Sequence, residues 1–136
     1  MKKQVTIELP GIKAVSRNET TGHWFRYSAQ LTKAENWMCT YGKAKEVRFD
    51  KPVDVIISAY YNTTGRSQAA DTPNIDDKIF TDILIRYKSS KKFGRIERPV
   101  WFIEDDSPKY LRRVIKQSIP SNHYKVVIEI KEVDGD

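Results

Sequence analysis

Alternating apolar and polar residues predict strands at four places in the chain. Residues 5–9 alternate in this way, and Pro10 follows where such a strand would end. The β-rich run 53–61 predicts a second strand, followed by a turn-like segment. Residues 110–119 and 124–133 predict two more strands, the last with Val126, Ile128 and Ile130 on one face.

Apolar residues at helical spacing predict two helices. Ser28 is placed to cap the first helix and Gly42 to end it. The apolar face of this helix comprises Leu31, Ala34, Met38 and Tyr41. Asn74 is placed to cap the second helix, which is predicted to end near Ser89. Its apolar positions are Ile75, Ile79, Ile83 and Tyr87.

A short apolar run, residues 100–104, predicts a further strand, and residues 88–98 before it are predicted to form a loop. The elements then follow in the order β, α, β, α, β, β, β. This order is typical of an α+β fold in which two helices pack on a single mixed sheet. A chain of 136 residues fits one domain, spanning residues 1–136.

The composition favours a protein that binds a polyanion and does not span a membrane. The chain has 24 Lys and Arg against 18 Asp and Glu, a net charge of +6. A basic small domain often binds nucleic acid, although charge alone is weak support. No apolar run approaches the ~18–20 residues that a membrane span needs. A single cysteine, Cys39, offers neither a disulfide framework nor a Cys-based zinc site, so we expect a cytoplasmic protein.

Two acidic groups are candidates for a metal site. The first lies at a predicted strand-to-helix junction and contains Asp71, Asp76 and Asp77, and the second is the pair Asp105 and Asp106. Carboxylates converging from strand ends make an all-oxygen site that suits Mg²⁺ or Mn²⁺, and such an ion can activate water for phosphodiester cleavage. The alternative is structural, because acids are favoured in the first turn of a helix and in turns.

Ile7-Glu8-Leu9-Pro10 is predicted to form a strand that ends in Leu-Pro, and Ser16-x-Asn18 follows it. This opening is similar to that of the RusA-type Holliday junction resolvases, and the resemblance extends along nearly the whole chain. Residues 78–84 resemble the second half of the family's Asp-x-Asp-Asn-x-x-Lys-x-x-x-Asp-x-Leu signature. Asp105 and Asp106 stand where the family has paired aspartates.

The first half of that signature departs from the family pattern, and three registers stay open. Counting back from Lys78 places the two family aspartates at Thr72 and Asn74. Matching residues 73–77 instead places Asn74 and Asp76 at the metal positions, with two residues deleted before Lys78. In a third register Asp71 takes part.

The resemblance implies a RusA-like homodimer that binds four-way DNA junctions and nicks them symmetrically with Mg²⁺. Such a protein would act in DNA recombination and repair and would be of phage or prophage origin. Two active sites for two nicks would follow from two-fold symmetry. By the same resemblance the metal ligands are Asp71, Asn74, Asp76 and Asp106, and the catalytic residues are Lys78, Asp76 and Asp106. The alternative is a non-catalytic branched-DNA-binding module with a degenerate metal site.

The segment between the second helix and the run 100–104 is the candidate DNA-contacting surface. It is rich in cations and includes Phe93, an aromatic residue that could stack on or wedge between bases. The alternative is a solvated loop with one anchoring Phe. The predicted DNA contacts are Lys91, Lys92, Phe93, Arg95, Arg98, Arg112, Lys116 and Arg17.

Overall fold

A computed structural model describes residues 3–12, 14, 24–63 and 75–133, with backbone only for 24–27. Its main sheet has four strands in the order β1-β6-β2-β5. The strands are β1 (Gln4–Pro10), β2 (Val53–Asn62), β5 (Leu111–Ser121) and β6 (Lys125–Glu132). β6 runs antiparallel to both β1 and β2, whereas β2 and β5 are parallel, so the predicted mixed sheet is confirmed.

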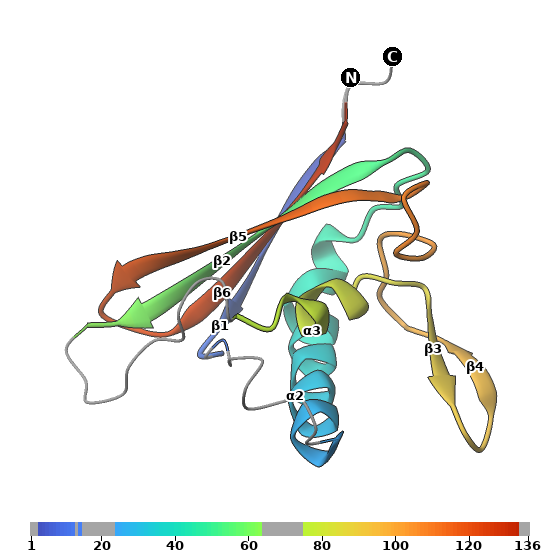
Figure 1. Ribbon diagram of the computed structural model, residues 1–136, viewed down its shortest axis with the longest axis horizontal. Coiled ribbons are helices and arrows are strands. Elements are labelled where there is room, and N and C mark those ends of the chain that lie inside the picture. The colour runs from blue at the N-terminus through green and yellow to red at the C-terminus, as the bar shows by residue number, and fades with distance from the viewer. Residues whose placement is uncertain (1–2, 13, 15–23, 64–74, 134–136) are drawn as a thin grey trace.

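One face of this sheet is apolar and carries the core. The register places Ile7 beside Ile128 and Ile128 beside Ile57, and all three side chains are fully buried. Side chains alternate across a strand, so the neighbours two residues away, such as Val55 and Ile130, share this face. Figure 1 shows both helices on the same side of the sheet. The predicted α+β class with two helices is therefore confirmed.

β2 lies between two strands that are adjacent in sequence. β5 and β6 are joined by the short connection 122–124, yet each pairs with β2 and not with the other. At the far end of β2 the Thr63 amide donates a hydrogen bond to the Ser121 carbonyl at 3.1 Å. The connection therefore crosses the end of β2.

The first helix is longer than predicted. α2 (Trp24–Trp37) continues into a π-helical turn, η1 (Met38–Gly42), and a 3₁₀ turn, η2 (Lys43–Lys45). Gly42 does not end the helix, because its backbone is still right-handed helical and its position is buried. A Cβ at Gly42 would collide with the Met38 sulfur, so close packing accounts for the glycine. Tyr41 is 41% exposed and does not join the buried face.

The second helix is much shorter than predicted. α3 covers only Asp77–Asp82, and its N-cap is Asp76. Asn74, the predicted cap, lies outside the described residues. Ile79 and Ile83 are buried as expected, but the chain becomes extended before Tyr87. The helical spacing of the apolar residues thus continued past the end of the helix.

A β-hairpin replaces the predicted loop. β3 (Tyr87–Ser90) pairs antiparallel with β4 (Gly94–Glu97), and the two form a second sheet, so the prediction of a single sheet was wrong. Gly94 ends the turn at φ +71°, a conformation that side chains with a Cβ rarely adopt. Figure 1 shows this hairpin beside α2, standing away from the main sheet.

The predicted strand at 100–104 is also wrong. Val100, Trp101, Phe102 and Ile103 are all buried, but among the described residues the segment makes only one β-bridge, between Ile103 and Ile85. Phe102 instead donates one backbone hydrogen bond to the Leu84 carbonyl and accepts one from the Phe49 amide. Burial of consecutive residues explains the apolar run without strand pairing.

No helix among the described residues is both long enough and apolar enough to span a bilayer. The RusA-like character of the fold and the homodimer stay predictions.

Candidate nucleic-acid interface

The turn of hairpin β3–β4 presents an aromatic ring among cations. Phe93 is 69% exposed, and the Lys92 ammonium lies 5.2 Å from its ring centroid. Lys91 and Arg95 are also exposed, and the Arg95 guanidinium lies 4.1 Å from the centroid of the Tyr87 ring. Four of the predicted DNA contacts, Lys91, Lys92, Phe93 and Arg95, therefore occupy one projecting element.

The base of the hairpin is braced by Arg98. This side chain is only 6% exposed, and its Nη1 donates hydrogen bonds to the carbonyls of Ile85 (2.9 Å) and Tyr87 (3.3 Å). A buried guanidinium that donates to backbone carbonyls is occupied inside the protein. Arg98 was a predicted DNA contact, but it lies within the molecule, and we leave it out of the DNA-contacting set.

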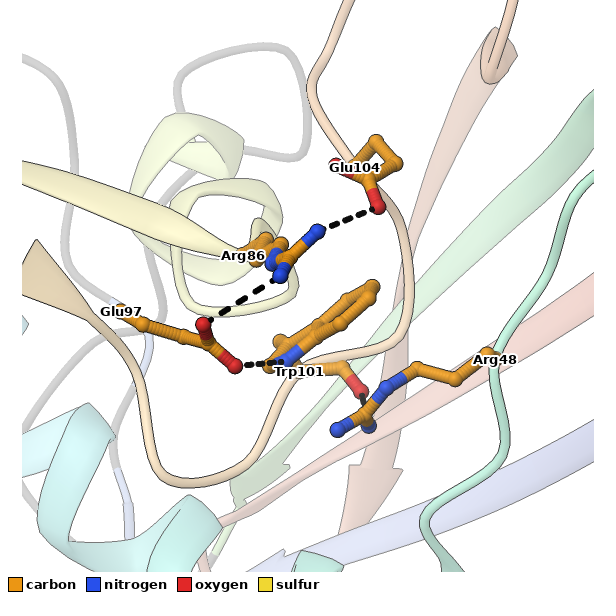
Figure 2. A network of polar contacts seen from close by, with 5 residues as sticks. All are labelled: Arg48, Arg86, Glu97, Trp101 and Glu104. Atoms are coloured by element: carbon orange, nitrogen blue, oxygen red, sulfur yellow. Dashed lines mark hydrogen bonds and ion pairs between the residues drawn. The ribbon is translucent and has the colours of Figure 1, made fainter.

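Figure 2 shows a second brace, built around Trp101. The guanidinium groups of Arg48 and Arg86 lie 3.7 Å and 5.0 Å from its ring centroid. Arg86 pairs with Glu104 at 3.0 Å and with Glu97 at 3.4 Å, and the Trp101 indole donates to Glu97 at 3.2 Å. Because Glu97 ends β4, this network ties the hairpin to the buried segment that follows it. The sequence patterns did not reveal it.

Asp76 and the residues next to it organise the start of α3. The Asp76 side chain is buried and accepts a hydrogen bond from the Lys78 amide at 3.2 Å, as an N-cap does. Asp77 accepts one from the Lys116 ammonium at 3.1 Å, and Lys116 also donates to the Ile75 carbonyl at 3.1 Å. Lys116 was a predicted DNA contact, but its side chain fastens β5 to the beginning of α3. Lys78 is exposed.

The second acidic pair lies in the loop before β5. Asp105 accepts a hydrogen bond from the Ser107 amide at 2.7 Å. Hydrogen bonds from the Ser107 side chain and amide hold the pKa of Asp105 below its ordinary value, and the charges of Lys109 and Arg95 lower it further. Asp106 is exposed.

Asp54 forms ion pairs with two arginines, which the sequence patterns did not reveal. It is 8% exposed, and its carboxylate accepts two hydrogen bonds from Arg112, at 2.9 and 2.6 Å, and one from Arg113 at 3.0 Å. Alternation along β2 turns Asp54 away from the helices. Arg112, another predicted DNA contact, is 48% exposed on its side chain and remains accessible from solvent.

The predicted magnesium ligands are only partly described. Asp71 and Asn74, like Arg17 among the DNA contacts, lie outside the described residues. Within the described part of the chain, no three His, Cys, Asp or Glu side chains come together in a group that would hold a metal ion. The magnesium site stays a prediction.

The chain matches no protein-family model, and no curated protein matches it.

Proposed function

We propose that this protein is a Mg²⁺-dependent endodeoxyribonuclease that binds four-way DNA junctions and nicks them. The observation that carries the proposal is the braced hairpin with Phe93 69% exposed at its turn, between Lys92 and Gly94. The acidic pair Asp105 and Asp106 follows the hairpin in the chain, in the loop before β5.

A cationic element with an exposed aromatic tip suits branched DNA better than a continuous duplex. Lys91, Lys92 and Arg95 would neutralise phosphates and release counterions, which gives affinity without sequence preference. Phe93 needs a base face to pack against. Inserting such a wedge into a regular duplex costs a few kcal/mol of lost base stacking. At a crossover the stacking is already interrupted, so the wedge meets a smaller cost there.

Cleavage is assigned to the acidic residues in the proposal. Asp71, Asn74, Asp76 and Asp106 would hold Mg²⁺, which supplies an activated water and stabilises charge on the phosphate. Lys78, exposed on the first turn of α3, would contact a phosphate oxygen. Paired nicks need two such sites, which a two-fold homodimer would provide.

Cleavage of a synthetic four-way junction tests the proposal. Purified protein is incubated with the junction and with a linear duplex of the same sequence, with and without Mg²⁺, and the products are separated on a denaturing gel. We expect nicks in the junction only, and only with Mg²⁺ or Mn²⁺. Asp106→Asn should abolish the nicks while junction binding persists, because the carboxylate is lost and the cationic hairpin is unchanged.

The matched control is Asp50→Asn, which removes one charge from an exposed carboxylate in the loop before β2. This variant should cleave like the unmodified protein. Full cleavage by Asp106→Asn would refute the assignment of that residue. Junction and duplex binding with equal affinity would refute the branched substrate.

A second candidate is a branched-DNA-binding protein without catalysis. The observation that favours it is the use of Asp76 as an N-cap and of Asp77 as the partner of Lys116, since both contacts explain these acids by folding alone. It predicts selective junction binding, dependent on Phe93, and no nicks with either divalent metal. The same gel and a binding titration separate the two candidates.

A further inference from the structure

A groove runs between helix α2 and hairpin β3–β4. It is an open hollow with a volume of about 860 Å³. The helix contributes Leu31, Thr32 and Glu35, and the hairpin contributes its lysines and two apolar side chains. We refer to this hollow as the α2–hairpin groove.

The charge in the α2–hairpin groove is predominantly positive. Lys88, Lys91 and Lys92 line it, against a single acid, Glu35. Glu35 pairs with Lys88 at 3.1 Å, and this pair links the helix to the hairpin. Lys91 and Lys92 are both exposed at the hairpin end. The groove therefore favours an anionic occupant and offers two ammonium groups to it.

The remaining lining is apolar and includes one aromatic face. Leu31 and Ile96 are partly buried, and Phe93 is largely exposed. An occupant that alternates anionic groups with flat apolar ones would satisfy both kinds of surface. A nucleic-acid strand with unpaired bases has this chemistry, because its phosphates meet the lysines and its bases stack on aromatic rings. An acidic peptide would match the charge but would offer no flat ring to Phe93.

We propose that the α2–hairpin groove binds an unpaired DNA strand. A duplex would meet the hairpin without entering a hollow of about 860 Å³, whereas an unpaired strand can enter it. The inference rests on the proposed function only in taking DNA as the partner. It adds to the junction a single-stranded segment, such as a flap or a gapped arm, as a further element that the protein binds.

Fluorescence anisotropy of a labelled oligothymidylate of about 12 nucleotides, titrated with the protein, tests the groove directly. Phe93→Ala should weaken binding by roughly 5- to 100-fold, the effect of losing one base–aromatic stack. Replacing Lys91 and Lys92 by Gln should lower the slope of log affinity against log salt by about 1.4, at ~0.7 for each phosphate contact on a single strand.

The matched control replaces Lys43 and Lys45 by Gln. These exposed lysines lie in η2, past the other end of the same helix, so the net charge changes equally while the groove is untouched. Tyr41→Ala is the control for an exposed aromatic residue. Both controls should bind the oligonucleotide as the unmodified protein does.

Three results would overturn the inference. One is an oligothymidylate affinity that Phe93→Ala leaves unchanged. Another is polyglutamate of similar charge, or vesicles with anionic lipid, competing for the groove as well as the oligonucleotide does. The third is tighter binding to a fully paired duplex than to the single strand. None of these results depends on cleavage, so the groove can fail while the junction nuclease stands, and a protein that never nicks DNA can still bind the strand.

Discussion

Replacing Asp76 by Asn and, separately, by Ala separates its role in folding from its proposed role in cleavage. The Asp76 side chain accepts a hydrogen bond from the Lys78 amide and so caps α3. Asn preserves this acceptor and is as good an N-cap as Asp, whereas Ala removes it at a cost of about 1 kcal/mol. Both variants lose a negative charge at the helix start, worth roughly 0.3–1 kcal/mol.

The capping contribution is therefore the difference between the two variants. We expect Asp76→Ala to be less stable than Asp76→Asn by about 1 kcal/mol, which corresponds to about 3–5 °C in Tm for a domain of this size. Urea unfolding followed by circular dichroism gives the difference directly, with Tm as a second measure. Equal stability of the two variants would refute the capping argument.

Cleavage by the same two variants then has a clear interpretation. If Asp76 binds the metal, Asp76→Asn should lose junction cleavage while it stays folded and still binds DNA. If Asp76 only caps α3, Asp76→Asn should cleave normally wherever the unmodified protein does. Because Asn keeps the cap, loss of activity in this variant does not arise from loss of the helix start.

Three further predictions concern stability. The pKa of Asp54 is held below its ordinary value of 3.8 by hydrogen bonds from Arg112, which outweigh the opposing effect of burial. The stability that the Asp54 ion pairs contribute is therefore present above pH 3.8 and is lost as the pH falls through the lowered pKa. Asp54→Asn should therefore flatten the fall of Tm at acid pH. An unchanged fall of Tm would contradict this. Phe102→Ala, at a fully buried site, should cost about 3–5 kcal/mol in urea unfolding, and a loss below about 1 kcal/mol would contradict its place in the core. Phe93→Ala should leave the free energy of unfolding within about 0.5 kcal/mol, since its ring is 69% exposed; a lowered urea midpoint would show that the ring packs against the protein.

The strands β1 and β6 could be predicted because buried and more open positions alternate along each, whereas β2 was predicted from a β-rich run that is buried on both faces over most of its length. In β6, for example, Val126, Ile128 and Ile130 are buried and the residues between them are partly exposed. This alternation is written in the sequence and needs no knowledge of the partners. The strand order could not be predicted, since neighbours in sequence usually pair, and here β2 separates β5 from β6.

The hairpin and the short second helix were missed for a related reason. Ile75, Ile79 and Ile83 are buried at helical spacing, but Ile75 lies before α3 and Ile83 after its last residue. Buried residues on either side of α3 thus give the sequence the apolar spacing of a longer helix. The strands of the hairpin are polar or partly exposed on both faces, so they carry no alternation. The turn glycine, Gly94, was the one available signal.

The candidate site was predictable as a set of residue types and not as an arrangement. The exposed cations and Phe93 of the hairpin were identified from composition, and their exposure agrees with that interpretation. Arg98 and Lys116 carry the same positive charge, but their side chains donate hydrogen bonds to backbone carbonyls of the protein itself. Charge in a sequence does not distinguish these two uses.

The position of β2 also constrains how the chain can fold. β5 and β6 are close in sequence but cannot close as a simple hairpin, because β2 must occupy the space between them. Every pairing in the main sheet therefore joins distant segments, as when Ile7 pairs with Ile128. Non-local pairings of this kind slow folding, since a long loop must lose conformational entropy before any stabilising contact forms. We expect refolding to be slow for a domain of this size. While the sheet is incomplete, its exposed strand edges should allow aggregation to compete with folding.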